Sequence, residues 1–186
     1  MEPDSFLHQI PRPYSRGEVL ARPSPVPAGP GLYAWFFVQP PPGVPTDGCV
    51  ERDGLQLLYV GISPSRPNSR QSLRHRLRTH YAGNAESSTL RLTLGCLLGL
   101  SLQRDGRSLT FGDGEATLST WMERNARVSW VVHPRPWEVE HLLVAKFAPP
   151  LNIQGSDHPY VAHLKRIRAE SRAGARSIGG ESNASV

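Results

Sequence analysis

Three short apolar runs along the chain have the length and composition of β-strands. They cover residues 32–38, 55–62 and 128–133, and aromatic and β-branched residues are frequent in them. In the third run, positions 128, 130 and 132 alternate with 129, 131 and 133, which is the twofold period of a strand. Prolines follow each run and mark its end. We expect the first two runs to pair as an antiparallel hairpin with an enlarged connection, and the third to join them in the core.

Other segments carry helical patterns. The expected helices span residues 69–81, 89–102 with a break near Gly99, 118–125, 137–147 and 159–172, and a short strand is expected at 108–111. In the first helix Leu73 and Leu77 share one face, while Arg76 and His80, also four residues apart, share another. Because strands and helices mix without a βαβ alternation, we predict a small α+β domain. Its core would be an antiparallel sheet of about three strands flanked by helices.

The same pattern divides the chain into regions. With 186 residues, the chain has room for one well-buried domain and its tails. Residues 11–30 are too rich in proline for a regular helix or strand, so residues 1–28 are expected to form a leader. We expect the folded domain, with inserted loops, at 29–155, a C-terminal helix at 156–173 and a disordered tail at 174–186.

Positive charge narrows the choice of partner. The formal net charge is +5, and no carboxylate lies between Arg70 and Tyr81. This stretch predicts contact with a polyanion such as DNA, with the phosphate backbone bound by Arg70, Arg74 and Arg78. A solvated helix face, in a chain whose arginine content reflects its genome, remains the alternative at this point.

The cysteines and the apolar stretches exclude several other classes of protein. Cys49 and Cys96 form no CxxC pair, which argues against a zinc site and is typical of reduced thiols. The first twelve residues lack the apolar core of a signal peptide, and no apolar stretch has the length of a membrane span. We therefore expect a cytoplasmic protein.

Four short pieces of sequence carry the candidate chemistry. In chain order they are Gly31-Leu32-Tyr33, Tyr59-Val60-Gly61, the pair Arg76 and His80, and the pair Glu140 and Asn152. This ordered set resembles the GIY-YIG nuclease family over about residues 31–152. The resemblance implies that Tyr33 and Tyr59 are the family's two tyrosines, Arg76 its catalytic arginine, His80 the histidine one turn later, Glu140 its metal-binding glutamate and Asn152 its structural asparagine.

The chemistry that the resemblance implies is phosphodiester hydrolysis. Glu140 would hold a single divalent cation, Mg²⁺ or Mn²⁺, and Arg76 would offer a fork of donors to the developing negative charge. Glu138 competes for the metal role, but two residues apart on a helix these side chains point about 200° apart. Either Tyr33 or Tyr59 would assist removal of the proton from water, and this choice stays open.

Two enlarged loops, at residues 40–54 and 63–71, place the chain nearer to the restriction-enzyme-like members of the family than to its compact members. A lysine that some members carry after the second triplet is absent, since Ile62, Ser63 and Pro64 stand there. The sequence thus predicts a metal-dependent DNA endonuclease, acting as a monomer or a dimer. Two alternatives are an inactive nucleic-acid-binding or scaffold domain on the same fold and a small protein-interaction domain.

Overall fold

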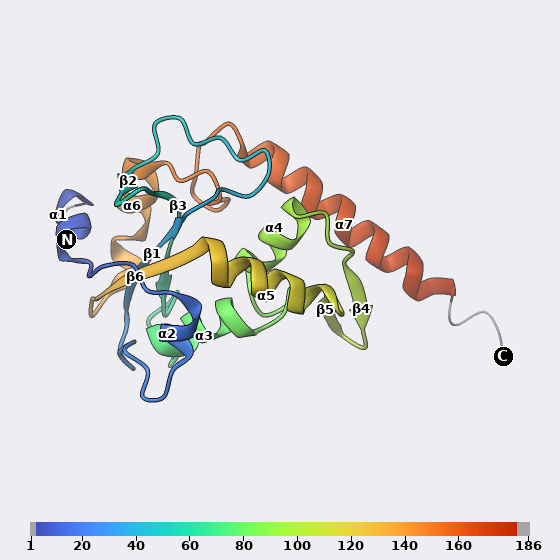
Figure 1. Cartoon of the computed structure of the whole chain (residues 1–186), viewed down its shortest axis with the longest axis horizontal. Coiled ribbons are helices and arrows are strands. Elements are labelled where there is room, and N and C mark those ends of the chain that lie inside the picture. Colours follow the sequence, from blue (N-terminus) through green and yellow to red (C-terminus); the bar gives the residue numbers. More distant parts are fainter. Residues whose placement is uncertain (1–2, 182–186) are drawn as a thin grey trace.

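A four-stranded antiparallel sheet forms the centre of the computed structural model, which describes residues 3–181 (Figure 1). Its strands are β1 (Gly31–Phe37), β2 (Glu51–Arg52), β3 (Leu55–Ser63) and β6 (Ala126–Val132), in the order β2-β3-β1-β6. A separate hairpin joins β4 (Gln103–Asp105) and β5 (Ser108–Thr110). The helices are α1 (Pro3–Gln9), α2 (Arg16–Leu20), α3 (Leu73–Ala82), α4 (Thr89–Leu97), α5 (Gly114–Asn125), α6 (Glu140–Phe147) and α7 (Val161–Glu181), and the 3₁₀ turn Pro136–Glu138 precedes α6.

Strand β1 is a central strand of the sheet: all seven of its residues are buried, and it pairs with a neighbouring strand on each edge. Tyr33 lies opposite Gly61 of β3 on one side and Trp130 of β6 on the other. Side chains alternate across the two faces of a strand, so β1 contributes Tyr33, Trp35 and Phe37 to one face and Leu32, Ala34 and Phe36 to the other.

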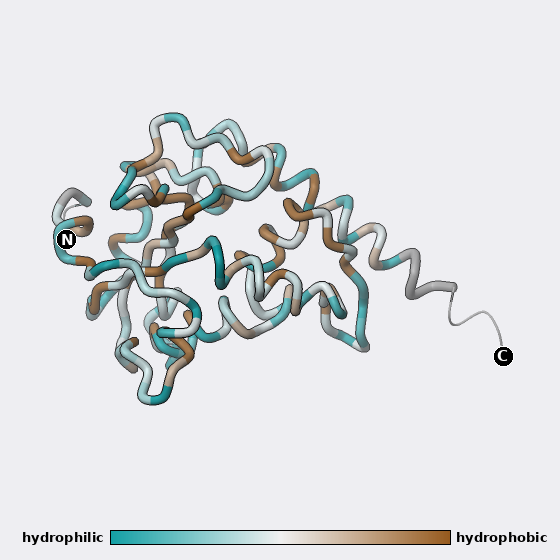
Figure 2. Tube along the Cα trace, viewed as in Figure 1, coloured by the Kyte–Doolittle hydropathy of each residue, from teal (hydrophilic) through white to brown (hydrophobic). Residues whose placement is uncertain are grey.

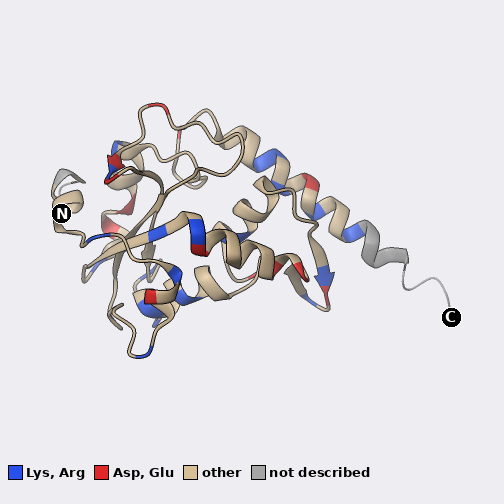
Figure 3. Cartoon of the chain, in the orientation of Figure 1, with Lys and Arg blue, Asp and Glu red and all other residues tan. Residues whose placement is uncertain are grey.

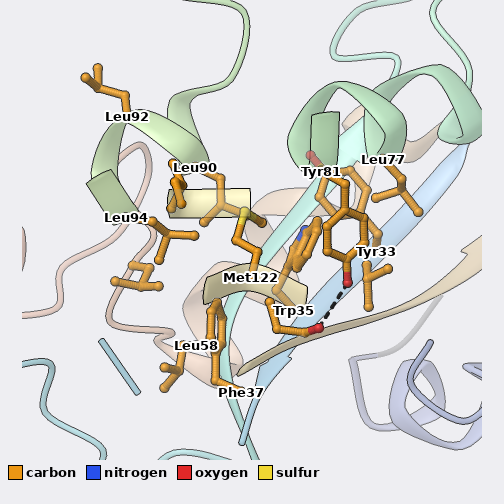
Figure 4. Close-up of a cluster of buried hydrophobic side chains, with 14 of the residues drawn as sticks. Tyr33, Trp35, Phe37, Leu58, Leu77, Tyr81, Leu90, Leu92, Leu94 and Met122 are labelled. Carbon is orange, nitrogen blue, oxygen red and sulfur yellow. Dashed lines mark hydrogen bonds between the residues drawn. The ribbon is translucent and has the colours of Figure 1, made fainter. Parts of the chain in front are cut away.

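Each face of the sheet is covered by its own hydrophobic cluster. The larger cluster joins the Tyr33 face to residues of α3, α4, α5 and α7, and Figure 4 shows its centre around Trp35, Tyr81 and Met122. The smaller cluster joins the Phe36 face to α1 and α6. Figure 2 shows hydrophobic residues gathered in the strands and α4, while the outlying loops and the tip of the β4–β5 hairpin are mainly hydrophilic. Layers on both faces confirm the expected α+β architecture.

The predicted hairpin of the first two long strands is confirmed, and the sheet gains a strand beyond the expected three. Strands β1 and β3 pair antiparallel, and the short β2 pairs with the start of β3. Asp53 (φ 53°) and Gly54 (φ 73°) form the two-residue turn between β2 and β3. An Asp-Gly pair favours this turn, so the sequence of the loop at residues 40–54 could have predicted the short strand β2.

The prediction that the prolines of residues 11–30 exclude helix and strand was wrong. Helix α2 begins after a capping box of Ser15 and Glu18, and Tyr14 forms a two-bond bridge with Val128 of β6. Val19 and Val26 are fully buried in the larger cluster. The segment is therefore packed on the domain, and its prolines lie on either side of a short helix.

The C-terminal boundary also needs correction. Helix α7 continues to Glu181, so residues 174–181 are helical where a disordered tail was expected. The remainder of that expected tail, residues 182–186, lies outside the described residues. Among the described residues, no helix has the length and apolarity that a membrane crossing requires.

Candidate active site

Two strands place a pair of tyrosines side by side on one face of the sheet. The rings of Tyr33 (β1) and Tyr59 (β3) are stacked with their centroids 6.4 Å apart. Gly61 makes room for this arrangement, because a Cβ atom there would lie 2.7 Å from the hydroxyl oxygen of Tyr33. Gly31 has a similar role, since its Cβ would collide with the carbonyl oxygen of Val131. Close packing thus requires both glycines, Gly61 against the Tyr33 ring and Gly31 against the neighbouring strand β6.

Helix α3 delivers Arg76 and His80 to the same place. Leu73 and Leu77 are fully buried and seat the helix on the larger cluster, which turns Arg76 and His80 toward Tyr33. A hydrogen bond of 2.9 Å joins the Tyr33 hydroxyl to His80 Nε2, and Arg76 Nε donates to the same hydroxyl over 3.4 Å. The expected face of Arg76 and His80 is therefore present in the structure, and its side chains meet Tyr33.

His80 is fully buried, and its hydrogen bonds link α3 to the start of a second helix, α4. Its Nδ1 forms a 2.7 Å hydrogen bond with the hydroxyl of Ser88, the N-cap residue of α4. Burial, with the nearby charges of Arg76 and Arg91, lowers the pKa of His80 well below its ordinary value of 6.5. The ring is therefore neutral, with one nitrogen donating and the other accepting. Sequence reasoning missed Ser88, although a serine before an apolar helical run is a recognisable N-cap signal.

Glu140 is the first residue of α6, and its side chain is half-buried near Arg76. Burial raises the pKa of Glu140, and the charge of Arg76 opposes this rise. Glu138, by contrast, lies in the preceding 3₁₀ turn, is exposed and forms a 3.1 Å ion pair with Arg135. The break between the two elements separates the two glutamates, and only Glu140 lies among the other candidate residues.

Asn152 fastens the segment after α6 to the edge of β3. Its side-chain amide donates to the carbonyl oxygen of Val60 and accepts from the amide of Val60, both over 2.9 Å. The backbone amide of Leu151 donates to the carbonyl oxygen of Leu58 over 3.0 Å. Asn152 is buried and makes the pair of bonds that a neighbouring strand would make, and this position agrees with a structural role.

A cavity of about 490 Å³ opens beside Tyr59 and Glu140. We call it the Glu140 cavity. Its walls are Tyr59 of β3; Thr89 and Thr93 of α4; Glu140, His141 and Val144 of α6; Leu151, Asn152, Ile153, Gln154 and Gly155 of the following loop; and Arg168 of α7. Sequence reasoning did not select Thr89 or Thr93. It weighed Arg168, with Lys165 and Arg166, as a phosphate contact and preferred a solvated helix face. The cavity places a carboxylate, hydroxyl groups and a guanidinium around one space.

Both tyrosines are neutral in this environment. Burial raises the pKa of Tyr33 and of Tyr59, each of them beyond the ordinary value of 10, and the charge of Arg76 lowers both. Arg76 alone does not outweigh burial. A phenolate at either position near neutral pH requires a further positive charge or a proton acceptor.

The three arginines expected to contact phosphate do not join this group. Arg70 is exposed in the loop before α3 and lines a separate groove with Trp137. Arg74 donates from Nε to the carbonyl oxygen of Val26 over 2.7 Å. Arg74 and Arg78 are each two residues from Arg76, which directs them about 160–200° away from it around the helix. Their role in nucleic-acid binding stays a prediction.

The residues present can accommodate one divalent cation. Within residues 3–181, no cluster of three or more His, Cys, Asp or Glu side chains could hold a metal ion by itself. In that same range no basic group lies within 4 Å of the Glu140 carboxylate, which lines the polar cavity. Mg²⁺ commonly binds through one or two carboxylates while waters and substrate phosphates complete its shell, so the site fits such an ion.

A family model described as the GIY-YIG catalytic domain matches residues 31–170. No curated protein and no solved structure matched the chain. The matched range begins at the first residue of β1 and includes α3, α6, Asn152 and the first half of α7.

Proposed function

The chain belongs to the GIY-YIG catalytic domain family, which implies nuclease activity on nucleic acid, and from this premise we propose that it is a metal-dependent endonuclease that hydrolyses DNA. The observation that carries the proposal is the convergence of Tyr33, Arg76 and His80, joined by hydrogen bonds, with Glu140 close enough to affect the pKa of Tyr33. This network lies beside the Glu140 cavity and beside Glu140, which has no basic group within 4 Å among the described residues. A purely structural hydrogen-bond network would need neither feature. The formal net charge of +5 supports a polyanionic substrate.

Arg76 is the residue that we assign to charge stabilisation. Its guanidinium is half-buried, and its Nη1 donates to the carbonyl oxygen of Ser87 over a long 3.4 Å bond. No carboxylate within the described residues lies within 4 Å of it, so its charge is available to a phosphate. A planar guanidinium can donate two parallel bonds to phosphate oxygens, which favours the transition state as charge accumulates there.

Tyr33 and His80 are the groups that we assign to proton transfer. We place the His80 proton on Nδ1, where it donates to Ser88, so that Nε2 accepts the Tyr33 hydroxyl proton. As water attacks phosphorus and the bond to the leaving oxygen breaks, Tyr33 takes a proton from water and passes its own to His80. A phosphate anion beside Arg76 offsets one of the charges that depress the pKa of His80, and this makes the ring a better acceptor.

Glu140 is the residue that we assign to metal binding. A bound Mg²⁺ or Mn²⁺ would act as a Lewis acid on a phosphate oxygen and stabilise charge on the leaving oxygen. The carboxylate must be ionised to bind a cation. Because burial raises its pKa, we expect binding to weaken with acidification at a higher pH than for an exposed glutamate.

Substitution of Glu140 tests this proposal, and Glu138 provides a matched control. Purified wild type, Glu140→Gln and Glu138→Gln are incubated with supercoiled plasmid, linear duplex DNA and RNA in Mg²⁺ or Mn²⁺. We expect wild type to nick or linearise DNA, a chelator to stop cleavage, and Glu140→Gln to cleave at least ~100-fold more slowly. Glu138→Gln should stay within ~3-fold of wild type because Glu138 is exposed and outside the site.

Three results would contradict the proposal in whole or in part. Equal trace cleavage by wild type and Glu140→Gln would mean that this site has no nuclease activity. Salt-sensitive binding without strand scission would instead identify an inactive nucleic-acid-binding domain. Cleavage of RNA alone would overturn DNA as the substrate and leave the nuclease assignment intact.

A further inference from the structure

Arg168 of α7 lies at the wall of the Glu140 cavity. The side chain is half-buried, and its buried Nε has no hydrogen-bond partner among the described residues. In the described part of the chain no carboxylate lies within 4 Å of this guanidinium, although other arginines of the protein are paired, such as Arg91 with Glu115. A partly buried charge without a partner is unfavourable unless a ligand supplies the opposite charge.

The neighbours of Arg168 in the helix extend this positive charge. Arg172 and Arg176 follow at intervals of four residues, so the three arginines share one side of α7 at a spacing of about 6 Å along the axis. Arg166 lies on the opposite side and forms a 2.9 Å ion pair with Glu170. Figure 3 shows basic residues recurring along α7 beyond the sheet. One side of the helix is thus neutralised by its own ion pair, and the other carries arginines with no ion pair to any residue that the structure describes.

The position of Arg168 relative to the candidate active site is fixed by packing. Leu164 and Ala175 are buried against the domain, and a contact of 3.3 Å from the thiol of Cys96 to the hydroxyl of Ser171 joins α7 to α4. Arg168 lines the same cavity as Tyr59 and Glu140, and the hydroxyl-bearing Thr89 and Thr93 of α4 line it as well. An anion bound by Arg168 would therefore be close to the group that we assign to the metal.

We propose that Arg168 binds a phosphate of the nucleic acid next to the one that is cleaved, and that Arg172 and Arg176 guide the strand outward along α7. Arginine suits this role because its fork of donors matches phosphate oxygens, and Arg168 lines the cavity. Thr89 and Thr93 supply hydroxyl groups to the same space. The proposal rests on the nuclease function above and extends it to a second phosphate subsite.

The test compares Arg168→Gln with Arg166→Gln, which removes the same charge from the opposite side of the same helix. Binding of a fluorescent duplex oligonucleotide to the full chain is measured by anisotropy in a chelator, at several salt concentrations, and cleavage is then measured with Mg²⁺. We expect Arg168→Gln to bind about tenfold more weakly and to lower the salt slope by about one. Its kcat/KM for cleavage should fall at least as much as its binding, while Arg166→Gln stays within about twofold of wild type.

Equal effects of the two substitutions on binding would overturn the subsite, because bulk charge alone would then explain them. If Arg168→Gln fails to fold in a thermal-unfolding control, Arg172→Gln takes its place, with an expected threefold weakening against the same Arg166→Gln reference. If wild type cleaves DNA but Arg168→Gln and Arg166→Gln bind and cleave DNA equally well, only the proposed subsite is refuted. A wild-type protein that cleaves nothing refutes the nuclease function itself.

Discussion

At the scale of single residues, the site depends on tight packing around one phenol. Gly61 leaves space for the Tyr33 ring, and His80 and Arg76 approach the hydroxyl of that ring from α3. A side chain at position 61 would have to displace a buried ring, which overpacks the site. The spacing of tyrosine and glycine in the two strand motifs is therefore explained by register, since Tyr33 lies opposite Gly61.

The neutral, buried His80 makes a prediction about stability and pH. The pKa of His80 lies well below 6.5 in the folded protein, so below about pH 6.5 the unfolded chain binds a proton that the folded chain excludes. The contribution of His80 to the free energy of unfolding is complete above that pH and is lost as the pH falls below it. Urea unfolding of wild type and His80→Gln at pH 8 and pH 5 measures this. We expect the difference in stability to shrink at pH 5, by up to ~1.4 kcal/mol per pH unit.

A difference between the two proteins that stays constant from pH 8 to pH 5 would show that His80 has no depressed pKa. The comparison cancels the other titrating groups, such as Glu18, whose pKa is lowered to about 2 by its hydrogen bond to Arg12.

The candidate residues show which parts of the site local sequence patterns can predict. Arg76 and His80 could be assigned to one face because an interval of four is local information, and Leu73 and Leu77 marked the face opposite to solvent. Arg168 could not be assigned, since its four-residue spacing with Arg172 is equally compatible with a solvated helix. Only the packing of α7 on α4 shows that Arg168 lines the cavity.

At the scale of elements, the segment after α6 completes the sheet without being a strand. Strand β2 pairs only with the start of β3, so the following edge of β3 needs other partners. Asn152 and the amide of Leu151 supply them at Val60 and Leu58. This connection also links α6, and hence Glu140, to the strand that carries Tyr59.

Substitution of Asn152 measures the importance of this connection. Asn152→Ala would leave the amide and the carbonyl of Val60 buried without partners, and each unpaired group costs about 1–3 kcal/mol. We expect urea denaturation to show a loss of about 2–5 kcal/mol, whereas Asn68→Ala in an exposed loop should change stability by less than about 0.5 kcal/mol. A loss of under 1 kcal/mol for Asn152→Ala would argue that water replaces the side chain and that the connection is dispensable.

The long elements were predictable because their period of hydrophobicity is strong, whereas short elements depended on tertiary contacts. Strands β1, β3 and β6 follow apolar runs that prolines end, helix α3 ends at Gly83, and helix α4 ends shortly before Gly99. Helix α2 was not predicted because prolines dominate the sequence on both sides of it. Ser15 and Glu18, which form its capping box, were a local signal for its start. The burial of Val19 against α3 and α5 is a long-range contact that local sequence does not contain.

At the scale of the whole molecule, the candidate site joins segments that are far apart in the chain. The two tyrosines come from β1 and β3, Arg76 and His80 from α3, Glu140 from α6 and Arg168 from α7. The larger core cluster holds the strands, α3 and α7 together, while α6 is seated by the smaller cluster on the other face. Both faces of the sheet must therefore be packed before the site is complete.

We propose that Arg76 stabilises charge during cleavage of a phosphodiester bond, and a single-turnover cleavage rate measures this role. Arg76→Lys keeps the positive charge but loses the fork of donors, while Arg74→Lys makes the same change on the same helix outside the site. With DNA bound to saturating protein and Mg²⁺ present, we predict a rate at least ~100-fold below wild type for Arg76→Lys and within about twofold for Arg74→Lys. Cleavage by Arg76→Lys at the wild-type rate, or loss of cleavage in both variants alike, would show that Arg76 does not have this role.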